Sequence, residues 1–150
     1  MNTEVQKSTD ELLRLLYMES SLDHLLSQSE SSLRALDFAA HITALSKRRG
    51  EPPERIINRA NIEKSFGHQL FSGRRKPSRD TVLQLAFGFE LDYAGTQELL
   101  SAAQKSLLYP RVKRDLIVIF CLLHRCSIVE CQMCLQEHDL PLLGEGKRCE

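Results

Sequence analysis

The chain lacks the sequence patterns by which many enzymes and membrane proteins are recognised. Its 150 residues contain no serine–histidine–aspartate order, no glycine-rich loop that would cradle a phosphate and no motif of paired carboxylates. The longest unbroken apolar run, LIVIFCLL at 116–123, is too short to cross a bilayer, and the polar opening MNTEVQKSTDELL is not typical of an export signal. We therefore expect a cytoplasmic protein that is not an enzyme, needs no cofactor and does not associate with a membrane.

The alternation of apolar and polar residues that is typical of strands is also missing. Apolar residues recur instead at the three- and four-residue spacing of helices, and Ser78, Asp92 and Ser127 stand where helix N-caps are expected. Gly50 follows a cationic last turn, and the next helix opens with the proline pair at 52–53. Asn61 suits the left-handed conformation of a tight turn between two helices. These signals predict an all-α fold.

The expected helices divide the chain into three parts. Residues 1–31 hold an amphipathic helix, introduced by a possible capping box at Ser8 and Glu11, and a serine-rich hinge. Residues 32–106 hold five helices, among them one at 63–71. Residues 107–150 hold a pair, at 112–124 and 127–138, that we expect to pack on the core because the segment LIVIFCLL is apolar on every face.

The charge of the chain is zero overall but unevenly distributed. Residues 1–46 contain 3 Lys/Arg and 7 Asp/Glu, residues 47–79 contain 10 and 3, and residues 80–150 contain 7 and 10, so the balances are −4, +7 and −3. Such a basic third can be a solvated surface, but it also favours a partner of opposite charge, above all nucleic acid.

Five cysteines in a chain without an evident export signal indicate free thiols rather than disulfides. Cys131 and Cys134, with His138 one turn further on, form a conceivable zinc site, although zinc needs four ligands that converge from separate turns or loops. The alternative is that these cysteines pack as small apolar residues, as buried cysteines commonly do. We favour this second interpretation and expect no metal.

From residue 37 to residue 103 the chain resembles the lambda-repressor-like, or Xre-type, helix-turn-helix family. The resemblance rests on RIINRANI at 55–62, EKSFGHQLFSG at 63–73 and RRKPSRDTVLQLAFGFELD at 74–92, with Gly73 and Pro77 in the junction as its most specific part. It covers under half of the chain, which as a whole is similar to small helix-turn-helix proteins of Firmicutes. It implies a bacterial or phage transcriptional regulator that binds double-stranded DNA.

By this resemblance the helix at 63–71 reads the major groove. The base-reading positions fall on Lys64, Ser65 and Gln69, with His68 beside them, and these side chains suit base edges. The loop cations and the start of the next helix would lie against phosphates: Arg74, Arg75, Lys76 and the backbone from Ser78.

Three departures from the family pattern leave a second interpretation open. Gly67 stands where the family has a core aliphatic residue, Phe71 replaces a glutamate, and Phe66 stands where a small polar residue commonly faces DNA. Phe66 either turns inward to fill the space at Gly67 or stays exposed as an apolar contact. In the exposed case the same face would make the chain a protein-binding module or inhibitor without base readout, of the mobile-element type that includes anti-restriction and anti-CRISPR proteins.

One helix-turn-helix unit reads few base pairs, so we expect a homodimer. The N-terminal helix has a narrow apolar stripe and a hinge after it, which makes it the better dimer element. We therefore expect Leu15, Leu22 and Leu26 in or beside the interface.

Overall fold

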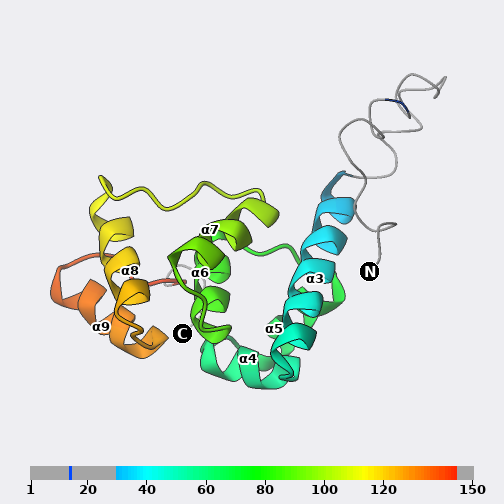
Figure 1. Ribbon diagram of the computed structural model, residues 1–150, viewed down its shortest axis with the longest axis horizontal. Coiled ribbons are helices and arrows are strands. Elements are labelled where there is room, and N and C mark those ends of the chain that lie inside the picture. The colour runs from blue at the N-terminus through cyan, green and yellow to red at the C-terminus, as the bar shows by residue number, and fades with distance from the viewer. Residues whose placement is uncertain (1–13, 15–29, 145–150) are drawn as a thin grey trace.

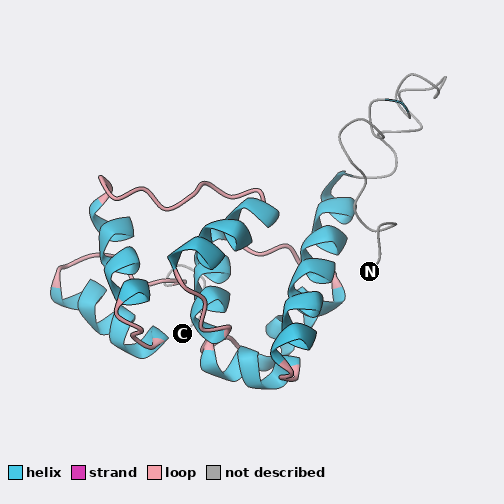
Figure 2. Ribbon diagram, viewed as in Figure 1, coloured by secondary structure: helices cyan, strands magenta, loops and turns pink. Residues whose placement is uncertain are grey.

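The structure, a computed structural model, describes residue 14 and residues 30–144 (Figures 1 and 2). These residues form seven α-helices and no strand, which confirms the all-α prediction. The helices are α3 (Glu30–Arg49), α4 (Pro53–Arg59), α5 (Lys64–Ser72), α6 (Arg79–Gly88), α7 (Tyr93–Ala102), α8 (Lys113–Leu123) and α9 (Ile128–Glu137). The capping box predicted at Ser8 and Glu11 lies outside the described residues.

Helix α6 is the centre of the bundle. It packs against α4, α7 and α9, and seven of its ten residues are buried. In Figure 1, α3, α4 and α5 lie to one side of α6, and α8 and α9 lie to the other. One apolar core runs through all of these helices, with Ile42, Leu70, Val82, Leu99, Leu122 and Leu135 among its buried members. Every other helix is therefore positioned, directly or through one neighbour, by α6.

The helix starts follow the capping residues expected from the sequence. The side chains of Ser78 and Asp92 each accept a hydrogen bond from the backbone N–H three residues further on, at 3.2 Å and 2.8 Å. Ser127 and Glu130 form a complete capping box at the start of α9. Pro53 is the first residue of α4, where the missing N–H costs no helical hydrogen bond. The predicted N-caps are thus confirmed.

All seven described helices end in one way. A residue with positive φ follows the last turn, and the next N–H donates to the carbonyl five residues before it, as Ile62 does to Ile57 at 3.2 Å. Glycine takes this conformation after α3 and α5, as expected. The other five helices place a non-glycine residue there: Asn61, Glu90, Gln104, Arg125 and Asp139. The sequence predicted only Asn61 among these five.

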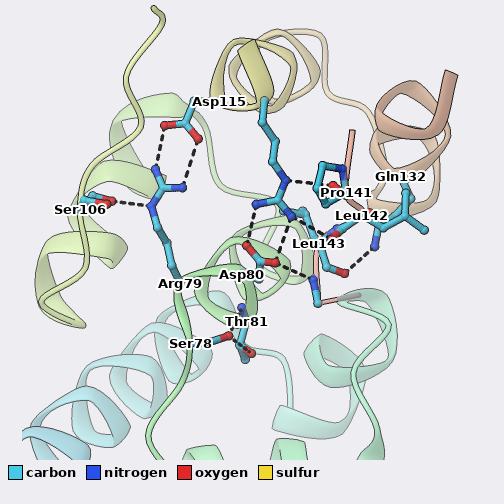
Figure 3. A network of polar contacts seen from close by, with 12 residues as sticks. Ser78, Arg79, Asp80, Thr81, Ser106, Asp115, Gln132, Pro141, Leu142 and Leu143 are labelled. Atoms are coloured by element: carbon cyan, nitrogen blue, oxygen red, sulfur yellow. Dashed lines mark hydrogen bonds and ion pairs between the residues drawn. The ribbon is translucent and has the colours of Figure 1, made fainter. Parts of the chain in front are cut away.

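Two adjacent residues of α6 pair with two adjacent residues of α8 (Figure 3). The Arg79 guanidinium donates to both carboxylate oxygens of Asp115, at 3.1 Å and 2.8 Å, and Asp115 also accepts the Tyr109 N–H at 3.0 Å. Arg79 further donates to the carbonyls of Ser106 and Leu107. Asp115 is buried, so its charge depends on these donors.

The second pair joins Asp80 to Arg114, with both N···O distances at 3.0 Å. Arg114 also donates to the carbonyls of Pro141 and Leu142, and Asp80 accepts the Gly144 N–H at 2.8 Å (Figure 3). Burial acts to raise the pKa of Asp80, but hydrogen bonds from Arg114 and Gly144 outweigh it and hold that pKa below its usual value. The start of α6 therefore anchors both the beginning of α8 and the segment after α9.

The C-terminal pair packs on the core, but only one face of α8 does so. Val118, Cys121 and Leu122 are buried, whereas Leu116 and Phe120 on the opposite face are about half exposed. The segment LIVIFCLL is thus not covered on every face as its composition had suggested. No helix in the described ranges combines the length and the hydropathy that a membrane span requires.

We predict that Asp115→Asn lowers the free energy of unfolding by about 2–3 kcal/mol. This is less than the roughly 3–5 kcal/mol typical of a broken buried pair, because the Arg79 side chain is 24% exposed and water can solvate it. Urea unfolding followed by circular dichroism measures the change. Glu98→Gln, at an exposed position of α7, is the matched control and should change stability by less than about 0.5 kcal/mol. Equal effects of the two substitutions would contradict the role given to the pair.

Candidate nucleic-acid interface

Helix α5 follows α4 after a short turn, and the two helices pack against each other. Asn61 takes the left-handed conformation with φ of 58°. Glu63 is the N-cap, because its carboxylate accepts the backbone N–H groups of Ser65 at 3.1 Å and Phe66 at 2.8 Å. The helix consequently runs over 64–72, one residue later than the 63–71 predicted.

The side chains expected to read bases lie on one face of α5. Lys64, Ser65 and His68 are exposed, and Gln69 is half-buried. Ser65, His68 and Gln69 lie one, four and five residues after Lys64. In an α-helix this spacing places the four side chains within one solvent-facing sector. The structure therefore brings these predicted residues together.

Two carboxylates border this face, and sequence reasoning did not identify them. The Oε2 atom of Glu54 on α4 lies 3.9 Å from the Lys64 Nζ and 3.9 Å from the His68 Nε2. Hydrogen bonds from the N–H groups of Phe66 and Ser65 lower the pKa of Glu63, so that it is ionised at neutral pH. The exposed face of α5 is thus of mixed charge. The acidic residue in the first turn of α4 and the one at the N-cap of α5 were visible in the sequence as signals for this.

Phe66 and Phe71 are not free apolar contacts. Both are partly buried and pack against the core. The Arg75 guanidinium carbon lies 5.9 Å from the centre of the Phe66 ring, and the Phe71 ring centre lies 6.3 Å from that of Phe89. Phe66 therefore does not remain an exposed apolar contact, but it is only partly buried.

The space at Gly67 is filled by Ile57 of α4 and not by Phe66. A Cβ atom at Gly67 would lie 2.6 Å from the Ile57 Cγ2 and 2.8 Å from its Cγ1 and Cδ1. Both residues are buried. Glycine is therefore required for the close approach of α4 and α5, because the Ile57 side chain fills the space that a side chain at position 67 would occupy.

The loop after α5 presents cations directly beside this face. The N–H groups of Arg74 and Arg75 both donate to the Gln69 carbonyl, at 2.9 Å and 3.3 Å, which holds the loop against the end of the helix. The side chains of Arg74, Arg75 and Lys76 are exposed, and Pro77 is buried. Backbone hydrogen bonds thus fix the start of the loop at the end of α5, while its charged side chains are exposed.

Ser78 ends the loop and caps α6. Its hydroxyl accepts the Thr81 N–H and lies 2.9 Å from the Thr81 Oγ1. Since the hydroxyl serves the cap, the group that Ser78 can offer to a phosphate is its backbone N–H, as expected for a helix N-terminus.

Not all of the basic excess in residues 47–79 is available to a partner. Arg59 donates to the two Glu51 carboxylate oxygens at 2.8 Å and 2.7 Å, and Arg49 donates to the same carboxylate at 2.9 Å. These two guanidinium groups lower the pKa of Glu51 to about 2. With Arg79 held by Asp115, Arg49, Arg59 and Arg79 are thus engaged in internal ion pairs. The loop cations at 74–76 remain exposed, as do Lys47, Arg48 and Arg55 of the same basic stretch.

The cysteines of α8 and α9 show no arrangement suited to a metal. Cys121, Cys126, Cys131 and Cys134 are free thiols. Burial raises the pKa of Cys131 to about 11, and burial with the neighbouring Cys131 thiol raises that of Cys121, so both are neutral thiols. His138 caps α9 and lies with its Nδ1 2.8 Å from the Cys134 carbonyl oxygen. Within the described residues, no three His, Cys, Asp or Glu side chains are placed to hold an ion.

The predicted dimer residues Leu15, Leu22 and Leu26 lie outside the described residues. Comparisons of the chain with models of protein families, with curated proteins and with solved structures gave no match.

We predict that Gly67→Ala destabilises the protein, although alanine is the better helix former by about 1 kcal/mol. The overlap with Ile57 should cost about 1–3 kcal/mol and so exceed that gain. In an Ile57→Ala background, which removes the overlapping atoms, the same change should be neutral or stabilising. Urea unfolding of the four proteins in this cycle gives the coupling. A stabilising Gly67→Ala in the native background would rule out the close approach.

Proposed function

We propose that the protein is a DNA-binding transcriptional regulator of the helix-turn-helix type, in which α5 enters the major groove of double-stranded DNA. The observation that carries the proposal is the joint placement of two sets of exposed side chains. Polar groups suited to base edges share one face of α5, and three loop cations follow directly at 74–76. A helix that inserts into the groove brings the loop after it to the phosphate backbone.

The chemistry of the α5 face fits base readout. The Lys64 ammonium can donate to guanine O6 and N7, the Gln69 amide can pair with adenine through two hydrogen bonds, and Ser65 suits either base. Glu54 and Glu63 reduce the positive potential of this face, so general attraction to phosphate would come from the loop. Affinity and sequence discrimination would thus be divided between loop and helix.

A second candidate is a protein-binding module that keeps the fold without reading bases. The exposed apolar side chains of α8 favour it, because such surface commonly marks protein contacts. The half-buried position of Phe66 favours the DNA-binding candidate, because it leaves the α5 face polar.

Selection from a randomised library of short duplexes, followed by mobility shifts at two salt concentrations, tests the proposal. An enriched motif, bound with steep salt dependence and preferred over scrambled duplex, supports it. Absence of enrichment and of any shift at low salt would overturn it and leave the protein-binding candidate.

We predict that Arg74→Ala with Arg75→Ala weakens binding to every duplex alike. Loss of two phosphate contacts should reduce the slope of log affinity against log salt by about 2. Lys105→Ala with Arg125→Ala removes the same charge away from the loop and should leave that slope unchanged. If the loop variant instead loses discrimination between selected and scrambled duplex, its cations contact bases.

For the helix we predict the opposite behaviour. Gln69→Ala and Lys64→Ala should each cost about 1–3 kcal/mol on the selected duplex and much less on scrambled DNA. Fluorescence anisotropy with both duplexes measures the difference. Ser72→Ala, at the exposed end of α5, serves as the control. Equal losses on both duplexes would mean that these side chains do not reach base edges.

A further inference from the structure

An exposed apolar stripe follows the outer face of α8. Val112, Leu116, Phe120 and Leu123 recur at helical spacing and are 47%, 49%, 55% and 64% exposed. Among the residues whose side chains are described, 14 and 37–144, the exposed large apolar side chains lie between positions 107 and 133. A cluster of exposed apolar side chains is typical of a site for a protein partner.

Two cations, Arg111 and Lys113, border the stripe and are exposed. His124 is also exposed, and its ring centre lies 4.1 Å from that of Phe120. Asp115, the one carboxylate of α8, is buried and paired with Arg79. Two α8 helices that met face to face would therefore bring like charges together. The complementary partner is an amphipathic helix with acidic flanks.

The chain carries one such sequence at its own N-terminus. Residues 1–29 hold five Asp/Glu against two Lys/Arg. Leucines at helical spacing run through the same segment: Leu12, Leu15, Leu16, Leu22, Leu25 and Leu26. The stripe of α8 and this segment thus match in both apolar pattern and charge.

The position of α3 decides whether the segment and the stripe belong to one copy or to two. Only residues 27–29 separate Leu26 from the start of α3, a connection that spans roughly 14 Å at most. Helices α3 and α8 lie at opposite ends of the long axis of the molecule (Figure 1). The helix to which the segment is joined therefore lies at the other end of the molecule from the α8 of the same copy.

We propose that residues 12–26 of each copy dock on the α8 stripe of a second copy, which gives a reciprocal dimer. The four half-exposed side chains offer on the order of 400 Å² of apolar surface. Two reciprocal contacts, each with a similar area from the segment, would bury about 1,600 Å², the size of a standard stable interface. This inference goes beyond the proposed function, because it concerns the free protein and is tested without DNA.

Light scattering on the full chain, at concentrations from micromolar upward, tests the proposal with two variants. Phe120→Glu disables the stripe, and Leu15→Glu with Leu22→Glu disables the segment. Each should raise the dimer dissociation constant on the order of 100-fold, because a buried unpaired carboxylate opposes docking. Met133→Glu, which alters an equally exposed residue of α9 at 55%, is the matched control and should remain dimeric. Circular dichroism confirms that each variant is folded.

Mixing the two disabled variants gives the decisive result. A mixed dimer keeps one working contact, between the intact segment of one variant and the intact stripe of the other, so an equimolar mixture should form dimers that neither variant forms alone. A dimeric Phe120→Glu variant would indicate contact between two N-terminal segments, and a dimeric segment variant would indicate contact between two α8 helices. Either result overturns the proposal, as does a native chain that stays monomeric or a mixture that stays monomeric.

Discussion

The double ion pair between α6 and α8 is the constraint on which the rest of the structure depends. Arg79 and Asp80 begin α6, Arg114 and Asp115 begin α8, and each cation pairs with the other helix's carboxylate. A buried carboxylate is stable only with its donors in place, so these contacts permit one relative position of the two helix starts. The two arginines also donate to the carbonyls of 106–107 and 141–142, which fixes both ends of the C-terminal unit.

Internal ion pairs engage part of the basic excess of residues 47–79. Arg49 and Arg59 share the Glu51 carboxylate and Arg79 pairs with Asp115, and both carboxylates are largely shielded from water. The loop at 74–76 lies between the end of α5 and the cap of α6, two elements held by backbone hydrogen bonds. Its charges are thus presented by a fixed turn, and little conformational entropy would be lost when they meet a phosphate backbone.

Local rules predicted most of the fold, and contacts between distant residues account for what they missed. The helices that begin after Ser78, Asp92 and Ser127 were predictable, because an N-cap side chain accepts a hydrogen bond from a backbone N–H within three residues of itself. The Arg79–Asp115 pair joins positions 36 residues apart, and the Ile57 side chain meets Gly67 only once two helices have packed. Local patterns such as capping residues and the spacing of apolar residues carry no information on which distant residues will meet. The side chains of the candidate α5 face were expected from the resemblance to helix-turn-helix proteins, whereas the position of Glu54 beside that face depends on how α4 packs.

Helix α8 connects the buried core to the exposed apolar stripe. Its inner face carries Asp115, Val118 and Leu122 into the core, and its outer face carries Leu116 and Phe120 to solvent. Asp115 holds Arg79, the residue next to Ser78, which ends the cationic loop. A partner on the outer face of α8 would therefore bind a helix whose inner face is hydrogen-bonded to Arg79, directly after that loop. In the proposed dimer, α8 would both contact the second copy and help to position the loop cations. Two copies would then present their loops to one DNA duplex in a fixed geometry.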